Sequence, residues 1–287
     1  MEIALHIGAH KTASTYIQDT LELNMQLLSR NNIKYIPLKE MRKSVTLKFK
    51  FGRINTNMLS KLLRVNTDSI RLILSDENLI GAPGDLIKQG TIYEKSRSRL
   101  SILCNALGDE DFFVYLSVRS YETFIPSLYL ELLRHQSFFS FTEFTRKFDI
   151  FDISWYKIVR SLCIKFRQET ITLWDYAEFR NIEDEVFHSL IGSQLPIVKL
   201  THPVRPSLSG KAVAALDALR AVLSDDEIRP FVRPISQAFP KGAKYPAFMP
   251  FPEDTAMKLR AHFAADMARI RADFPQILWL GSQGHRS

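Results

Sequence analysis

Four short apolar segments, each followed at once by polar residues, constrain the fold of this chain most strongly. They cover residues 2–7, 70–75, 112–118 and 170–174. Segments of this length and composition predict buried strands. Strands that are apolar along most of their length are typical of parallel sheets covered on both faces.

Segments with helical spacing lie between and after these strands. Residues 14–30 repeat apolar side chains every three or four positions, and residues 154–166, 210–223 and 253–274 also have helical character. This order predicts an α/β fold with a central parallel sheet, helices on both faces and a P-loop-like architecture. The side chains expected to form the apolar faces of the first and last of these helices are Ile17, Leu21, Met25 and Leu28, and Met257, Phe263, Met267 and Ile270.

A chain of 287 residues is long enough to form one large α/β domain, so we expect residues 1–287 to fold as a single domain. Residues 225–252 are rich in proline and apolar side chains. We predict that they form a long ordered loop that closes over the site.

The formal net charge of +7 raises the local concentration of anionic ligands without selecting among them. The densest positive run covers residues 34–53, where Glu40 is the acidic residue. The run is either a solvated face or a surface that guides an anionic acceptor, and we expect no nucleic-acid partner. Its basic residues are Lys34, Lys39, Arg42, Lys43, Lys48, Lys50 and Arg53.

Cys104 and Cys163 are far apart in apolar or helical surroundings, which favours free thiols in a reducing compartment. No basic leader and no apolar stretch of bilayer length is evident, so we expect a cytoplasmic protein without a transmembrane segment. The histidines show no metal-ligand spacing, so no metal site is predicted. The sequence leaves a homodimer open.

A phosphate-binding loop is predicted between the first strand and the first helix. Residues 8–15 combine amides at a helix N-terminus with hydroxyls and a lysine. His10 occupies the position of the second glycine of a Walker A loop, so the match to that motif is incomplete. The alternative is an ordinary basic turn capped by Ser14. The residues of the loop are Gly8, Ala9, His10, Lys11, Thr12, Ala13, Ser14 and Thr15.

Residues 5–18, LHIGAHKTASTYIQ, resemble the 5′-phosphosulfate loop of sulfotransferases that use 3′-phosphoadenosine 5′-phosphosulfate (PAPS), especially the bacterial ones. The resemblance implies that Lys11 contacts the bridging and sulfuryl oxygens. It also implies that the loop's backbone amides and the hydroxyls of Thr12, Ser14 and Thr15 hold the 5′-phosphate. Ala13 replaces the commoner glycine, so we expect an ordinary φ there.

Arg119 follows the strand at 112–118, and Ser127 lies eight residues later. An arginine at a strand end and a hydroxyl on the next helix can grip one phosphate together. In the sulfotransferase family this pair binds the 3′-phosphate, so the resemblance assigns that role to Arg119 and Ser127. Two halves of one nucleotide signature thus occur in order along the chain.

A weaker resemblance concerns residues 241–244. Lys241, Gly242, Ala243 and Lys244 are similar to the loop that closes over the nucleotide in heparan-type members. Lys244 lies near the position of a basic residue there, although no arginine is present. The resemblance implies that these four residues contact the nucleotide.

Transfer of a sulfuryl group also requires a base that takes the proton of the acceptor. Glu77, in a Ser-Asp-Glu-Asn-Leu turn after the strand at 70–75, resembles a turn of bacterial members, and we expect burial beside Asp76 to raise its pKa. Alternatively, Glu77 and Asp76 cap the turn that follows. His10 is a second candidate for the base.

These features predict an enzyme that transfers a sulfuryl group from PAPS to a hydroxyl or amine, with a carbohydrate or glycolipid as the leading acceptor. Lys11, Glu77 and His10 are the candidate catalytic residues. Two alternatives stay open. The first is an ATP-dependent small-molecule kinase, with Asp76 offered as a Mg²⁺ ligand. The second is a non-catalytic module that binds an acidic polymer through the basic run.

Overall fold

The computed structural model describes residues 1–50, 69–85, 91–108, 110–201 and 207–281, with the side chains of residues 49 and 50 excepted. Six strands in the described ranges form one parallel sheet in the order β2-β3-β1-β4-β5-β6. The strands are β1 (Glu2–His6), β2 (Ile33–Ile36), β3 (Arg71–Ser75), β4 (Asp111–Val118), β5 (Ile171–Asp175) and β6 (Leu278–Trp279).

The predicted α/β class and parallel sheet are confirmed. The four expected strands are present, and the chain order places β1 between β3 and β4. Sequence inspection missed two strands at the sheet edges. β2 lies inside the charged segment and contains Lys34, and β6 has two residues, so neither has the apolar run that marks a buried strand.

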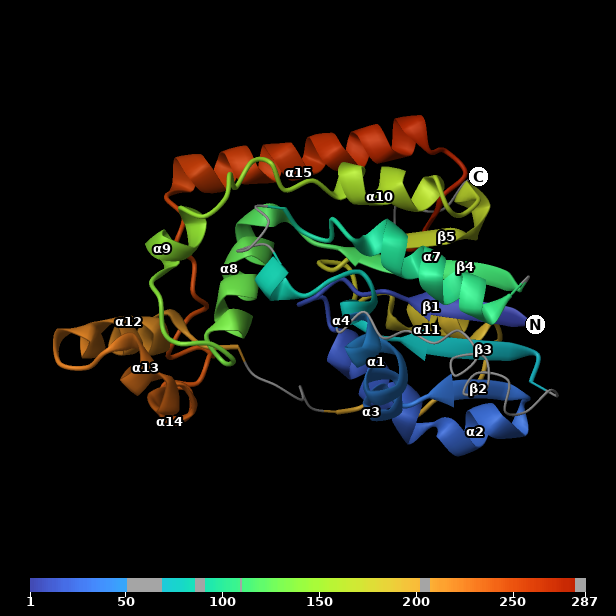
Figure 1. Cartoon of the computed structure of the whole chain (residues 1–287), viewed down its shortest axis with the longest axis horizontal. Coiled ribbons are helices and arrows are strands. Elements are labelled where there is room, and N and C mark those ends of the chain that lie inside the picture. The colour runs from blue at the N-terminus through green and yellow to red at the C-terminus, as the bar shows by residue number, and fades with distance from the viewer. Residues whose placement is uncertain (51–68, 86–90, 109, 202–206, 282–287) are drawn as a thin grey trace.

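Alternate side chains of the strands point into two separate cores, one on each face of the sheet. Leu5 of β1 and Leu116 of β4 lie in the core formed with α7 (Ser96–Leu107), α8 (Tyr121–Leu132), α10 (Trp155–Cys163) and α15 (Glu253–Asp273). Ala4 and Tyr115, their chain neighbours, lie in the core formed with α1 (Ser14–Leu23), α2 (Met25–Arg30) and α11 (Glu183–Ile191). This period of two explains why the central strands are apolar along most of their length. Figure 1 shows α15 and α10 running along one side of the sheet.

The helix expected over residues 14–30 is divided at Asn24, which ends α1 and precedes α2. The interruption resets the helical phase. Met25, expected on the apolar face, is therefore 38% exposed, whereas Ile17, Leu21 and Leu28 are buried as predicted.

The closing helix corresponds to α15, and its predicted apolar face is correct except at Met257. Met257 is 53% exposed, while Leu259 is fully buried together with Ile270. In a helix, positions 259, 263, 267 and 270 follow one another at intervals of three or four, and position 257 lies away from that stripe.

A buried carboxylate, Asp266 of α15, joins three helices near the site. Its Oδ2 accepts hydrogen bonds from the Tyr121 hydroxyl, the Ser154 hydroxyl and the Tyr156 amide. A buried carboxylate needs several such donors to offset its lost hydration. The network fixes the start of α8, the helix that carries Ser127.

The remaining helices are short. Between β2 and the first gap lie α3 (Leu38–Met41), a π-helical segment (Arg42–Thr46) and α4 (Leu47–Lys50). After β4 come α9 (Phe141–Thr145) and the 3₁₀ turn Gln168–Thr170. A lobe contains α12 (Gly210–Ala218), α13 (Asp225–Ile228) and α14 (Val232–Ala238), with 3₁₀ turns at Leu219–Ala221 and Arg229–Phe231.

The segment 225–252, predicted as one long loop, is helical in its first half. Residues 225–238 form α13, a 3₁₀ turn and α14, and irregular chain follows up to α15. Short capping signals explain the difference, since Ser224 and Glu227 form a capping box at the start of α13. The lobe projects from one end of the molecule (Figure 1).

Cys104 and Cys163 are free thiols, in agreement with the sequence prediction. In the described part of the chain, no helix is both long and apolar enough to cross a bilayer.

Candidate nucleotide-binding site

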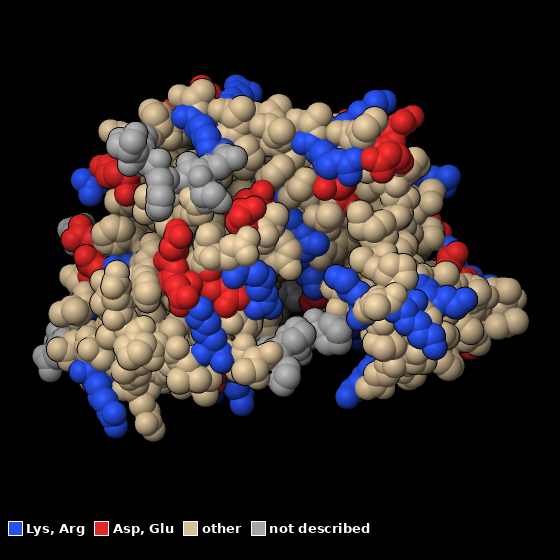
Figure 2. Space-filling view, turned by 180° about the vertical axis from the view of Figure 1, so that it is seen from behind, with Lys and Arg blue, Asp and Glu red and all other residues tan. Residues whose placement is uncertain are grey.

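A cavity of about 1520 Å³ lies at the carboxyl edge of the sheet, where the segments after β1, β3, β4 and β5 meet. Ligands of open α/β sheets bind at this edge, beside the point where strand order reverses. Typical ligand pockets have about 300–1,000 Å³, so this cavity is larger than most. Figure 2 shows a hollow between the body of the molecule and the lobe, with Lys and Arg side chains in its walls.

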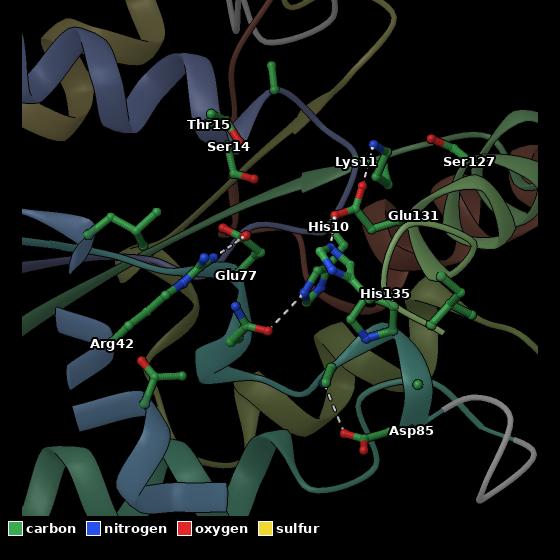
Figure 3. Close-up of a pocket in the computed structure, with 18 of the residues that line it drawn as sticks. His10, Lys11, Ser14, Thr15, Arg42, Glu77, Asp85, Ser127, Glu131 and His135 are labelled. Atoms are coloured by element: carbon green, nitrogen blue, oxygen red, sulfur yellow. Dashed lines mark hydrogen bonds and ion pairs between the residues drawn. The ribbon is translucent and has the colours of Figure 1, made fainter. Parts of the chain in front are cut away.

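Of the residues predicted from the sequence, eight line this cavity. Others shape it from below or lie elsewhere. The lining residues are His10, Lys11, Ala13, Ser14, Thr15, Glu77, Arg119 and Ser127. Figure 3 labels His10, Lys11, Ser14, Thr15, Glu77 and Ser127 among them.

Gly8 has no side chain, so the phosphate loop can approach the turn after β3 closely. Its φ is +103°, and a Cβ at this position would lie 2.8 Å from Glu77 Cβ. Glycine is therefore favoured for two reasons. It adopts the positive φ without strain, and it leaves room for the turn after β3. Gly8 brings the phosphate loop and Glu77 together without contacting the cavity itself.

Ala13 does not have the ordinary φ that we expected. Its φ and ψ are 67° and 16°, in the left-handed region, at the position that precedes α1. Because the loop must turn there to direct the first amides of α1 toward the cavity, the conformation that favours glycine persists although alanine occupies the position. Ser14 begins α1 and is not its cap, so the alternative of a Ser14-capped turn is wrong.

Thr12 and Ala9 contribute to the shape of the loop. The Thr12 hydroxyl donates to the Ala9 carbonyl over 2.7 Å, and both residues are fully buried. Ser14 and Thr15 carry the loop hydroxyls that do line the cavity, beside the amides of the first turn of α1. A helix N-terminus of this kind attracts phosphate, because its amides lack partners within the helix.

Arg119 and Ser127 meet as the sequence predicted. Arg119 Nη1 lies 3.3 Å from Ser127 Oγ and donates to the Lys11 carbonyl over 2.6 Å. Its Nε donates to Thr123 Oγ1, and its guanidinium lies over the Tyr176 ring at 4.7 Å. The arginine after β4 is thus attached directly to the loop after β1.

Lys11 points toward α8 and pairs with a residue that sequence reasoning missed. Its Nζ lies 3.1 Å from Oε2 of Glu131, and both side chains are about one-fifth exposed, at 20% and 21%. Burial lowers the pKa of Lys11. Burial opposes ionisation of Glu131 as well, but Lys11 and the neighbouring Arg134 and His135 hold the pKa of Glu131 below its usual value. Spacing could have revealed Glu131, which follows Ser127 by one helical turn.

Glu77 lines the cavity, but the expected rise of its pKa is wrong. Burial favours the neutral acid, yet charge interactions with His10 and Arg42 and a hydrogen bond from Gln18 outweigh it and lower the pKa. Oε1 accepts from Arg42 Nη2 over 2.8 Å, and Oε2 accepts from Gln18 Nε2 over 2.9 Å. The sequence prediction failed because it counted burial and omitted the arginine.

Asp76, not Glu77, caps the turn after β3. Asp76 Oδ1 accepts from the Asn78 amide and its Oδ2 from the Thr46 hydroxyl. Asp76 is fully buried and lies behind the cavity wall, whereas the Glu77 side chain reaches the cavity. The capping alternative therefore applies to Asp76 alone.

His10 has both ring nitrogens engaged within the protein. Its backbone amide donates to Tyr93 Oη, so the Tyr93 hydroxyl proton is free to donate to His10 Nδ1 over 2.8 Å. Nε2 then carries the ring proton and donates to Asn78 Oδ1 at 3.3 Å. Burial lowers the pKa of His10 and favours this neutral form. The arrangement orients the loop and leaves His10 poorly placed to accept another proton.

Residues 241–244 do not line the cavity; all four are exposed on the lobe. Sequence similarity suggested a closing loop, but the chain after α14 runs along the lobe, where Ser209 pairs with Ala247. Within the basic run, Arg42 alone among the described basic side chains lines the cavity, while Lys39 and Lys43 are exposed. The Lys50 side chain and Arg53 lie outside the described residues.

No group of three or more His, Cys, Asp or Glu side chains with metal-binding geometry occurs in the described ranges. No protein-family model matches the chain, and no curated protein matches it.

Among solved structures, the chain is similar to a sulfotransferase from Alicyclobacillus acidocaldarius, with 15% identity and a TM-score of 0.44 over 82% of this chain and 94% of that one. It is also similar to the mouse sulfotransferase SULT7A1 complexed with PAP, with 12% identity and a TM-score of 0.41 over 95% of this chain and 82% of that one.

Proposed function

We propose that this protein is a PAPS-dependent sulfotransferase that acts on a hydroxyl or amine of a carbohydrate or glycolipid. The single observation that carries the proposal is the bond from Arg119 to the Lys11 carbonyl, with Ser127 3.3 Å from the same guanidinium nitrogen. A nucleotide with phosphates at both 5′ and 3′ positions matches a loop at a helix N-terminus beside an arginine–serine pair.

In this proposal the loop amides and the hydroxyls of Ser14 and Thr15 hold the 5′-phosphate. Arg119 and Ser127 hold the 3′-phosphate. Lys11 stabilises charge that develops on the bridging oxygen as the sulfur–oxygen bond breaks and 3′-phosphoadenosine 5′-phosphate (PAP) leaves. The acceptor oxygen or nitrogen forms the new bond to sulfur, and its proton passes to Glu77. With its pKa lowered, Glu77 is ionised at neutral pH and ready to accept that proton.

The acceptor half of the cavity supports a polar acceptor. It is formed by the π-helical segment, the turn at residues 82–85, α7 and the end of α8. Of the described residues that line the whole cavity, the Tyr and Phe members are Tyr16 and Tyr176, on the nucleotide side. A phenol or other flat aromatic acceptor would call for Tyr, Phe or Trp side chains in this half, where the described apolar lining is aliphatic, as at Leu47, Ile102 and Leu132. The two free thiols support a cytoplasmic location.

The kinase alternative depends on Asp76 as the ligand of Mg²⁺. Asp76 would have to reach Mg²⁺ from a buried position where its oxygens already accept bonds from Thr46 and Asn78. In that position Asp76 is poorly placed to hold the metal that phosphoryl transfer from ATP requires.

Calorimetry with PAP, ADP and ATP tests the proposal. We expect PAP to bind at least about 10-fold more tightly than ADP, without Mg²⁺, because one phosphate grip is worth more than 1.4 kcal/mol. Arg119→Gln should remove most of that preference. Equal affinities for PAP and ADP would sink the proposal. Transfer of labelled sulfate from PAPS to pooled saccharides then tests the reaction itself.

A further inference from the structure

The ion pair between Lys11 and Glu131 occupies the place where the sulfuryl group of PAPS is proposed to lie. Lys11 Nζ is 3.1 Å from Glu131 Oε2, and both residues line the cavity. Figure 3 shows the Lys11 side chain paired with Glu131, with Glu77 on another side of the cavity. The cation of the phosphate loop is therefore paired with a carboxylate of α8.

PAPS and this ion pair compete for one ammonium group. The sulfuryl group is anionic, so it attracts Lys11 and repels the Glu131 carboxylate. PAP lacks the sulfuryl oxygens but keeps the former bridging oxygen on its 5′-phosphate, so it competes for Lys11 through fewer oxygens. Glu131 should therefore weaken the binding of PAPS more than the binding of PAP.

Once Lys11 has turned to the sulfuryl group, the Glu131 carboxylate needs other donors. A partly buried carboxylate without hydrogen-bond donors is costly. His135 Nε2, which belongs to the lining of the same cavity, lies 3.4 Å from Oε1, and Oε2 is the oxygen that Lys11 contacts. Leu132 and Gln136 continue the same wall, opposite the turn at residues 82–85.

We propose that Glu131 is an acceptor-binding residue: it releases Lys11 to the sulfuryl group and then accepts hydrogen bonds from hydroxyl or ammonium donors of the acceptor. The inference rests on the proposed function and adds a substrate class. The acceptor presents such donors next to the group that is sulfated, and it carries no carboxylate there, because two carboxylates in contact repel each other.

The spacing along α8 links the two substrates. Ser127, which contacts Arg119, and Glu131, which contacts Lys11, are one helical turn apart on the cavity side of the helix. One rigid helix thus carries a residue for the nucleotide and a residue for the acceptor. Their relative position determines where the acceptor lies with respect to the sulfuryl group.

The test compares PAPS and PAP binding to the full-length wild type and to Glu131→Gln by rapid calorimetry without acceptor. We expect PAPS to bind about 3- to 10-fold more tightly to the variant, the equivalent of a partly exposed ion pair, and PAP to gain less affinity than PAPS. In a Lys11→Ala background, Glu131→Gln should lose its effect on PAPS. Asp184→Asn, which breaks an exposed pair with Lys199 away from the cavity, should change neither affinity.

The acceptor arm uses labelled PAPS with three oligosaccharide probes: an amino-sugar, a neutral and a uronic-acid oligomer. The wild type should prefer the amino-sugar and neutral probes to the uronic-acid probe, and Glu131→Gln should raise the KM for the preferred probes by about 10-fold or more. A loss of acceptor affinity together with a gain of PAPS affinity would not follow from mere misfolding.

Equal changes of PAPS and PAP affinity in Glu131→Gln, or none, would overturn the exchange of partners. The acceptor role would be overturned if Glu131→Gln kept the wild-type order of KM values for the three probes. Transfer to none of the probes by the wild type would overturn it as well. Failure of the wild type to bind PAP would instead refute the proposed function, which makes the two failures distinguishable.

Discussion

Arg42 donates from its Nη2 to Glu77 Oε1 over 2.8 Å, across a sequence separation of 35 residues. Arg42 belongs to the π-helical segment after β2, and Glu77 follows β3. Through this contact Arg42, a residue of the basic run at 34–53, lies in the cavity wall. It also determines how readily Glu77 takes up a proton.

Replacement of Arg42 by Gln should raise the pKa of Glu77, because the positive charge that favours its ionised form is lost. If Glu77 acts as the base, the acidic limb of kcat/KM should move to higher pH. The measurement is a pH–rate profile with PAPS and a turned-over acceptor. Arg167→Gln, on the surface beside Glu169, is the matched control and should leave the limb in place. A limb that stays or moves to lower pH in Arg42→Gln would contradict the role of Glu77.

Lys11→Ala and Glu77→Gln should fail in different ways. Loss of the lysine removes a cation from developing negative charge, so kcat should fall by about 10²- to 10³-fold and the affinity for PAPS should decrease. Glu77→Gln keeps the size and polarity of the side chain but cannot accept a proton, so kcat should fall by about 10²- to 10⁴-fold while PAP binding survives. Single-turnover rates and PAP calorimetry separate the two. If Glu77→Gln retains most of its rate, the base is another residue.

Gly8→Ala should destabilise the fold by about 1–3 kcal/mol, because it places a side chain at a positive φ and within 2.8 Å of Glu77 Cβ. Gly242→Ala is the matched control: its added Cβ would have no atom within 4 Å and its φ is not in the positive range, so stability should change by less than about 0.5 kcal/mol. Urea unfolding of both variants gives the comparison. Equal stability of the two would show that the loop can move away from β3 at little cost.

Ala13→Gly should stabilise the protein by about 1 kcal/mol, since glycine adopts the left-handed conformation of this position without strain. The same substitution at Ala214, an exposed residue inside α12, should destabilise by about 1 kcal/mol. The opposite signs are the result to look for in thermal unfolding. A loss of stability in Ala13→Gly would mean that the φ of 67° relaxes in solution.

The free energy of unfolding should decrease as the pH is lowered from about 6.5 to about 4, because of His6. Burial lowers the pKa of His6 from 6.5 to about 4, so the unfolded chain binds a proton in this window and the folded protein does not. The contribution of about 3 kcal/mol is complete above pH 6.5 and is lost as the pH falls toward 4. His6→Gln should flatten that part of the curve of unfolding free energy against pH. His10, also buried, leaves part of the slope, and an unchanged slope would contradict the assignment.

Sequence patterns predicted the centre of this fold well and its edges poorly. Strands β1, β3, β4 and β5 are buried on both faces, and such burial demands apolar residues throughout. Among the described strands, the edge strand β2 pairs with one neighbour only, and it contains the partly buried Lys34. The helical part of residues 225–238 rests on capping side chains, which a proline-rich composition concealed.

The candidate site divides in the same way. Residues that follow central strands, such as Lys11, Glu77 and Arg119, could be found because strand ends converge at one edge of the sheet. Arg42 comes from a helical segment whose position depends on tertiary packing, and no local pattern marks it as facing the cavity. The pKa of Glu77 had the wrong predicted direction for this reason. Glu131 was missed although its spacing of one helical turn from Ser127 could have revealed it.

The position of β1 between β3 and β4 has a consequence for the chain as it leaves the ribosome. β1 emerges first, but its partner on one side, β4, begins only at Asp111. Until then one edge of an apolar strand stays unpaired, and exposed edges of that kind recruit other chains. Chaperones that shield nascent chains should therefore matter most between the synthesis of β1 and that of β4. A fragment that ends before β4 should aggregate rather than bind nucleotide.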